Sequence, residues 1–311
     1  MIDKTDILAI DNSRLRRLAT CASISVAAVL IAAKLIAWRM TDSVALLTSL
    51  FDSTFDLFAS LITAYGVARA LRPPDRGHRF GHGKAEPLAA LVQAVFIIGS
   101  SVLLVYEAAS RLYHPRAIAH EGIGYGVMAL ALALTFALVR FQDHVASKTG
   151  SVAIRADRLH YVGDLAVNLA VMAAFALQQL TEMVFFDSLF AFGIALGLMV
   201  SAVHILRQAL LALTDAELPE REREKIRAVV LCQPGVRGVH DMRTRSDSDR
   251  VFIELHVEMD GHMTLRDAHE LTEKISAALL AVIPNADILV HQDPVGIEEF
   301  RLDAQIEKEG T

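Results

Sequence analysis

Cysteine is nearly absent from this sequence, whose 311 residues include only Cys21 and Cys232. Two cysteines so far apart cannot form a CxxC motif, and they provide no disulfide framework. The sequence also contains no GxxxxGK[ST] loop and no HExxH or GxGD-type motif. These absences argue against ATP as an energy source and against an intramembrane enzyme. The polar N-terminus lacks the features of a removable signal peptide, and no nucleic-acid partner is expected.

Charge is missing from two long stretches. Residues 88–106 and 122–139 contain no charged side chain, and each is close to the roughly 20 residues that a spanning helix requires. The whole chain is 53% hydrophobic, far more than is usual for a soluble protein of this length. Weaker apolar runs lie at 21–38, 43–70, about 152–180 and 184–206. The sequence therefore predicts a membrane domain of six transmembrane helices.

Basic residues are concentrated in two of the segments between these runs. One segment, 69–84, carries five lysines and arginines, and the other, 140–158, carries four. The remaining connections hold few or none. Because positive charge is retained on the cytoplasmic side, both basic loops and both termini are expected in the cytoplasm.

The composition changes after Leu213, where a charged amphipathic segment begins. Residues 250–259 alternate between apolar and polar side chains, as in a half-buried strand. With a strand near 235–245, a helix capped by Thr264 and a strand from Ala286, the order is α-β-β-α-β. This order predicts a small α+β cytosolic domain of the ferredoxin or metallochaperone-like kind. The expected divisions are 1–215 for the membrane domain, 216–296 for the cytosolic domain and 297–311 for a tail.

Ionisable side chains within the apolar runs are the most informative feature of the chain, because they are costly in lipid and usually mark a pathway. Asp52 and Asp56 are four residues apart and share one face of the second helix, and His160 and Asp164 repeat this spacing on the fifth. The four side chains could instead face a wet cavity or bond to neighbouring helices. However, two buried carboxylates so close would repel each other unless a cation compensated them.

The set of three carboxylates and one imidazole suits Zn²⁺, Fe²⁺, Mn²⁺ or Cd²⁺ and gives no preference for Cu⁺. Tetrahedral Zn²⁺ fits best. The fifth helix must begin near residue 152, which places Arg155, Asp157 and Arg158 in its first turns. We interpret this polarity as an aqueous entrance from the cytoplasm, although a shorter helix with an interfacial His160 is an alternative.

Two further clusters contain candidate ligands. Asp75, His78 and His82 lie in a glycine-containing loop, where a solvated surface is the alternative interpretation. The cytosolic domain contains four histidines and an aspartate that suggest a site for one or two metal ions. These residues are His240, His256, His269, His291 and Asp293.

Taken together, these motifs resemble the cation diffusion facilitator family. The resemblance runs from about Arg14 to Pro294 and is carried by the following segments: DSTFD, RLHYVGD, HRFGHGKAEPLAAL and the terminal HQDP. It implies a homodimer in a bacterial inner membrane, with Asp52, Asp56, His160 and Asp164 as the transport site. It also implies a metal in the 75–82 loop, a binuclear regulatory site that includes Gln292, and a dimer interlock of Lys84 and Asp215.

The expected function is proton-coupled efflux of a divalent metal by alternating access, with His160 as the proton carrier. Zn²⁺ is the expected ion, both transported and regulatory, and Cd²⁺ and Fe²⁺ are alternative substrates. Asp52 stands where zinc-selective relatives often have histidine, so the identity of the metal stays open. The competing hypotheses are a membrane-anchored metal sensor, which would not need carboxylates at mid-bilayer, and a passive cation channel, which would favour rings of charge.

Overall fold

A computed structural model describes residues 4–41, 44–113, 122–181, 186–296 and 301–309. The chain divides into two compact units, Met1–Leu210 and Leu211–Thr311, which are considered separately below.

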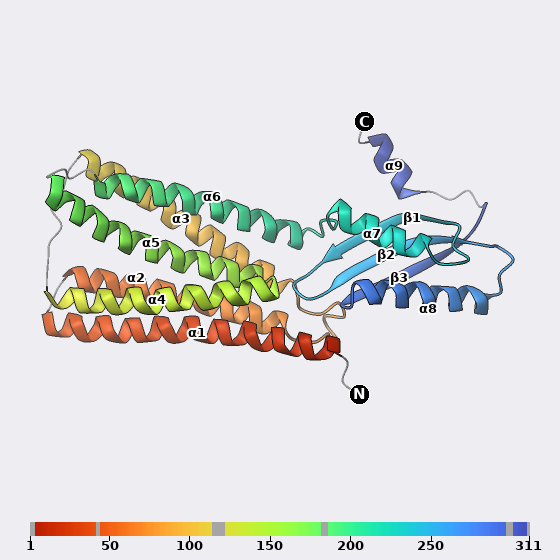
Figure 1. The fold of residues 1–311 in the computed structure, drawn as a ribbon, viewed down its shortest axis with the longest axis horizontal. Helices are drawn as coiled ribbons and strands as arrows, with labels where there is room; N and C mark the ends of the chain where they lie inside the picture. Colours follow the sequence, from red (N-terminus) through yellow and green to blue (C-terminus); the bar gives the residue numbers. More distant parts are fainter. Residues whose placement is uncertain (1–3, 42–43, 114–121, 182–185, 297–300, 310–311) are drawn as a thin grey trace. The chain divides into compact units, whose positions relative to one another are not determined.

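The first unit is a bundle of long α-helices (Figure 1). Its described helices are α1 (Lys4–Thr41), α2 (Val44–Ala70), α3 (Ala85–Tyr113), α4 (Gly122–Thr149), α5 (Val152–Thr181) and α6 (Phe186–Leu213). The start of α5 at Val152 agrees with the position expected from the sequence. Each helix has at least 27 residues and is therefore long enough to cross a membrane.

Four of these helices are also apolar enough to be candidate spans: they contain the segments Asp11–Met40, Ala85–Ser110, Gly126–Thr149 and Ser188–Leu213. The described residues of α2 and α5 contain no such span. These two helices carry the predicted intramembrane ligands, together with the arginines and Asp157 in the first turns of α5. In the part of the chain that the structure describes, length and composition thus support four spans.

The bundle is packed most closely at one end. A buried cluster there combines the beginnings of α1, α3 and α5 with the ends of α2, α4 and α6, and alanine is its commonest residue. Small side chains let helix backbones approach closely. At Gly66, for example, an added Cβ would lie 2.4 Å from the Cβ of Ala89 on α3. The end of the bundle that adjoins the 71–84 loop is therefore closed by tight packing.

Away from this cluster the helices separate into two groups. Figure 1 shows α3, α5 and α6 diverging from α1, α2 and α4 toward the other end of the bundle. In the first group α1 contacts α2 and α4, and in the second α3 contacts α5. Contacts of α2 with α3 and of α4 with α5 join the two groups. The middle of α2 and the middle of α5 lie where the groups begin to part.

A layer of buried polar side chains lies between the closed end and the middle of the bundle. The carboxylate of Asp157 on α5 is 1% exposed and accepts hydrogen bonds from Ser23 of α1 (2.7 Å), Gln142 of α4 (2.7 Å) and Ser60 of α2 (3.4 Å). The hydroxyl of Tyr161 lies 2.9 Å from that of Ser60. One carboxylate thereby connects four helices.

The second unit is a three-stranded sheet covered on one face by two helices. Its elements follow the order α7 (Glu220–Leu231), β1 (Gly238–Ser246), β2 (Val251–Met259), α8 (Leu265–Val282), β3 (Ala286–Pro294) and α9 (Leu302–Glu309). The predicted α-β-β-α-β order is confirmed. The side chain of Thr264 accepts a hydrogen bond from the backbone N–H of Asp267, as expected of the N-cap of α8.

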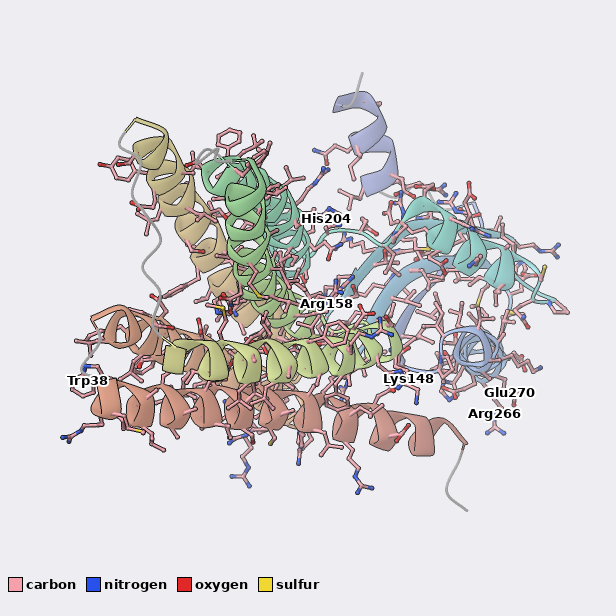
Figure 2. All side chains as sticks on the ribbon, turned by 60° about the vertical axis from the view of Figure 1, so that its left-hand side comes forward. Trp38, Lys148, Arg158, His204, Arg266 and Glu270 are labelled. Carbon is pink, nitrogen blue, oxygen red and sulfur yellow. The ribbon has the colours of Figure 1, made fainter. Side chains whose placement is uncertain are left out.

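The sheet has the order β1-β2-β3, with β2 antiparallel to β1 and parallel to β3. Alternate residues of β2, from Ile253 to Met259, pack against the apolar faces of α7 and α8. Arg266 and Glu270 are exposed on the outer side of α8 (Figure 2). The remaining face of the sheet carries the polar residues of β2, including His256.

The segment expected to be a tail contains a helix, α9, that is attached to β1. Asp241 and Asp303 exchange hydrogen bonds, each backbone N–H donating to the other carboxylate at 2.8 and 2.9 Å. Burial alone would raise the pKa of Asp241, but the N–H groups of Asp303 and Leu302 and the nearby His240 lower it below the usual value. An ion pair between Arg301, immediately before α9, and Glu258 attaches this segment to β2 as well.

The packing of α8 gives the first prediction. Ile275 is fully buried against the sheet, whereas Leu280 on the same helix is 41% exposed. We expect Ile275→Ala to destabilise the second unit by about 2–5 kcal/mol through the cavity it leaves, and Leu280→Ala to have a small effect. Hydrogen exchange of β2 amides in the full chain measures this difference. Equal loss of protection in the two variants would contradict the packing.

Candidate metal sites

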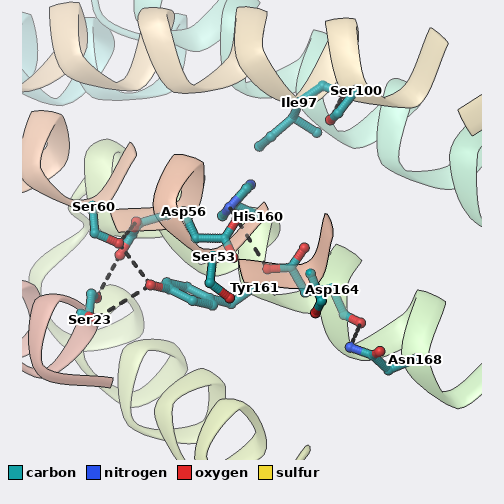
Figure 3. A network of polar contacts seen from close by, with 12 residues as sticks. Ser23, Ser53, Asp56, Ser60, Ile97, Ser100, His160, Tyr161, Asp164 and Asn168 are labelled. Carbon is teal, nitrogen blue, oxygen red and sulfur yellow. Dashed lines mark hydrogen bonds and ion pairs between the residues drawn. The ribbon is translucent and has the colours of Figure 1, made fainter. Parts of the chain in front are cut away.

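Three of the four predicted intramembrane ligands meet between α2 and α5. The Nε2 atom of His160 lies 2.9 Å from Oδ1 of Asp56 and 3.8 Å from Oδ2 of Asp164. One ligand atom from each residue lies within 4.8 Å of the others. Figure 3 shows the three side chains converging from the two helices. Two carboxylates and an imidazole at these separations match the donor set of a divalent transition metal.

Asp52 is not part of this group. It lies one turn before Asp56 on α2 and is exposed. Asp52 lies farther along α2 from the closed end of the bundle than Asp56 does. At this level α2 and α5 have begun to diverge, which separates Asp52 from the residues on α5. The role of Asp52 as a fourth ligand stays a prediction.

The polar first turns of α5 contact neighbouring groups. Asp157 is buried and hydrogen-bonded to three neighbouring helices, as described above. Arg158 pairs with Asp143 of α4 at 2.6 Å, and Arg155 donates to the backbone carbonyl of Gly150. The side chains of Arg158 and Asp143 are 34% and 49% exposed, and the aqueous entrance stays an interpretation.

Two residues near the group were not singled out as functional from the sequence. Asp157 lies three residues before His160, and this helical spacing could have indicated that it belongs to the same region of the bundle. Lys34 of α1 lies within the apolar run 21–38. Its ammonium donates to the backbone carbonyl of Ser49 (3.0 Å) and to the hydroxyl of Ser53 (2.6 Å), both on α2.

The loop between α2 and α3 brings together the second predicted set of ligands, Asp75, His78 and His82. The backbone N–H of His78 lowers the pKa of Asp75, with further contributions from the His78 ring and the N–H of Gly77. His82 is 8% exposed, and neither of its ring nitrogens has a hydrogen-bond partner among the described residues. A buried imidazole without such a partner, 3.3 Å from a carboxylate oxygen, fits a metal ligand.

The register of the sheet aligns three histidines of the second unit. His240 pairs with His256 across β1 and β2, and His256 pairs with His291 across β2 and β3. The buried carboxylate of Asp293 lies 3.3, 2.9 and 3.1 Å from their ring nitrogens, in the same order. The sheet thus fixes three imidazoles around one carboxylate, a set that fits Zn²⁺ or a similar ion.

Gln292 and His269 lie outside this group. Side chains alternate between the two faces of a strand, so Gln292 points to the opposite face from His291 and Asp293. Its amide donates to the hydroxyl of Thr272 on α8 at 2.8 Å. His269 is exposed on α8, which covers that same opposite face. Within one copy, the sheet separates the side chains of these two residues from the histidine row, which consists of His240, His256 and His291.

Lys84 and Asp215, the expected dimer interlock, belong to different units of the chain. Lys84 immediately precedes α3, and Asp215 follows α6 in a turn where its φ is +56°. Asp215 forms an ion pair with Arg245 at 3.4 Å. The interlock itself stays a prediction.

Comparison with known proteins gives matches along most of the chain. Residues 20–214 match the family model for the cation efflux transmembrane domain, and residues 218–295 match that for the cytoplasmic domain of cation efflux proteins. The cation-efflux pump FieF of Serratia proteamaculans is 42% identical over 285 residues, which are 92% of this chain and 95% of the relative. FieF of Yersinia pestis is 43% identical over 279 residues, 90% of this chain and 93% of the relative.

Solved structures of isolated domains also match. The metal-bound C-terminal domain of the CzcD transporter from Thermotoga maritima is 35% identical, covers 26% of this chain and 100% of that chain, and has a TM-score of 0.25. The cytosolic domain of a cation diffusion facilitator family protein is 33% identical, covers 26% and 100%, and has a TM-score of 0.24.

The family models cover both units, and the two curated relatives align along nearly their whole length. The chain belongs to the cation diffusion facilitator family of cation efflux transporters.

Proposed function

We propose that the protein exports a divalent transition metal, with Zn²⁺ the favoured ion, in exchange for protons and as a homodimer. The single observation that carries this proposal is the group formed by Asp56, His160 and Asp164 at the middle of two long helices. Ionisable residues at this depth are expensive and usually belong to an ion pathway. Cd²⁺ and Fe²⁺ are alternative substrates of the same donor set.

The packing of the bundle supports alternating access. The group lies beyond the tightly packed end and the buried Asp157 layer, at the level where the two groups of helices diverge. The exposed fraction of the ligand side chains rises from 15% for His160 to 38% for Asp164, which is farther along α5 from the closed end. An ion bound here would have access from one side only. Transport then requires a second arrangement with the opposite end closed.

The proposed orientation of the bundle in the membrane depends on six spans and on the basic segments between them. The two remaining helices, α2 and α5, carry the ligand group and the Asp157 network, so their charges are accounted for inside the bundle. With an even number of spans, both termini lie on one side. The basic segments 69–84 and 140–158 favour the cytoplasm of a bacterial inner membrane for that side.

Protons and metal compete for the same atoms, which supports proton coupling. A carboxylate or imidazole that binds a proton loses a lone pair needed for the metal, so metal binding releases protons and protons displace metal. His160 lies between both carboxylates and is the proposed carrier, since an imidazole changes charge near neutral pH.

The cytosolic unit is proposed to sense metal and to hold the dimer together. Three histidines around Asp293 provide one site in each copy. His269, on the far side of the sheet, could contribute to a second ion only through another copy of the domain, which fits a homodimer.

The transport site is tested by Asp164→Asn, which keeps the volume of the side chain and removes its charge. We expect zinc flux into proteoliposomes to fall on the order of 100-fold, since the loss of a ligand should cost at least as much as the loss of a supporting contact. Asp11→Asn, on the exposed part of α1, is the matched control. Flux through Asp164→Asn at the control level would rule out the site.

Proton coupling is tested in vesicles whose lumen can be made more acidic than the bath. Zinc uptake should accelerate when the lumen is acidified, because protons on the far side displace the ion, and it should return to the baseline rate when an ionophore equalises the pH. The readout is the initial rate from a zinc-sensitive dye inside the vesicles. A rate independent of the pH difference would exclude antiport.

The cytosolic site is tested by Asp293→Asn. Because this carboxylate contacts all three histidines, we expect zinc affinity at this site to fall at least about tenfold. Calorimetry in a background that already carries Asp164→Asn isolates the binding at this site from that of the membrane site. Asp287→Asn, an exposed position on the same strand, should leave the affinity unchanged.

A further inference from the structure

Lys34 is the basic residue closest to the intramembrane ligands along the described part of α1, and it turns toward them. It lies seven residues before the end of α1, about two turns of helix. A lysine so near a helix end in lipid ordinarily extends to the membrane surface. Here its ammonium is instead half-buried and hydrogen-bonded to α2.

The position of these contacts on α2 brings the ammonium to the side of the metal group. Ser49 and Ser53 lie one turn apart, and Asp56 follows Ser53 by three residues, so all three share a face of the helix. Ser53 is 1% exposed, and Figure 3 shows it beside Asp56 and His160. Because Ser53 lies one turn from Asp56, a positive charge bound to Ser53 acts on the carboxylates of the site.

The group that the structure brings together carries a formal charge of −2, from Asp56, Asp164 and a neutral His160, and a divalent ion brings it to zero. The ammonium of Lys34 adds one positive charge beside this group. Because net charge is costly in a poorly solvated region, this additional charge opposes the bound ion.

We propose that Lys34 is a fixed counter-charge of the transport site, which weakens metal binding enough for the ion to be released. When the site is empty, the ammonium partly neutralises the carboxylates. When a divalent ion enters, the ammonium of Lys34 repels this ion and limits the affinity of the site for it. Lys34 is thus a positioning and tuning residue, not a metal ligand. This inference depends on the proposed transport site of Asp52, Asp56, His160 and Asp164.

The test compares variants that remove the charge with one that keeps it. Lys34→Met and Lys34→Gln remove the ammonium, and glutamine retains a hydrogen-bond donor toward Ser53. Lys34→Arg keeps the charge. Lys148→Met is the matched control, since it removes a lysine charge at an exposed end of α4, 3.9 Å from Asp11 (Figure 2).

Zinc affinity is measured in full-length protein that carries Asp75→Asn and Asp293→Asn, so that binding reports the membrane site. We expect the Kd of Lys34→Met and Lys34→Gln to fall at least about tenfold, because a repulsive charge has been removed. In transport, both KM and kcat should fall in these variants, since tighter binding slows release. Lys34→Arg and Lys148→Met should retain affinity and kinetics close to those of the parent protein.

A purely structural role would give a different result. If Lys34 served only to join α1 to α2, its loss would loosen the site, and the Kd would rise or stay unchanged. That outcome, or a Lys34→Arg variant that behaves like Lys34→Met, would overturn the proposal. The binding measurement does not require transport, so a failure of zinc flux in the parent protein would count against the proposed function and leave this test intact.

Discussion

The structure depends on the cost of holding carboxylates away from water inside a bundle of apolar helices. Each such group needs hydrogen-bond donors or a positive charge nearby, and the bundle supplies these in two ways. Asp157 receives three side-chain donors from three other helices and needs no ion. Asp56 and Asp164 have one imidazole between them. The first carboxylate is held by structural hydrogen bonds, whereas the second pair is left available to the cation of the proposed transport site.

This contrast explains why two aspartates seven residues apart on α5 have different roles. Asp157 lies at the level where all the helices pack closely, so its donors are within reach. Asp164 lies two turns farther along, where α5 has moved away from the first group of helices and its side chain is 38% exposed. The divergence of the bundle therefore determines which acidic groups are satisfied by the protein and which are available to an ion.

Much of this arrangement follows from the sequence alone. The long helices, the start of α5, the α-β-β-α-β order and the three ligand groups were all predictable, because they depend on local periodicity and on spacings of three or four residues. The separation of Asp52 from the group was not, since it depends on how two helices diverge. The burial of Asp157 and the orientation of Lys34 also depend on neighbours distant in sequence. The family resemblance implied Gln292 among the ligands, whereas the alternation of β3 directs its side chain to α8.

One irregularity in β1 has a consequence for the histidine row. Between the pairs His240–His256 and Arg243–Glu254, β1 has one residue more than β2. The extra residue forms a bulge at Asp241, whose φ is +47°. This bulge places His240 and Arg243 on the same face while Met242 enters the core. Without this bulge, regular alternation along β1 would place His240 and Arg243 on opposite faces: either His240 would leave the row, or Arg243 would turn into the apolar core. Metal coordination at the proposed site and packing of the domain are therefore linked through one bulge in β1.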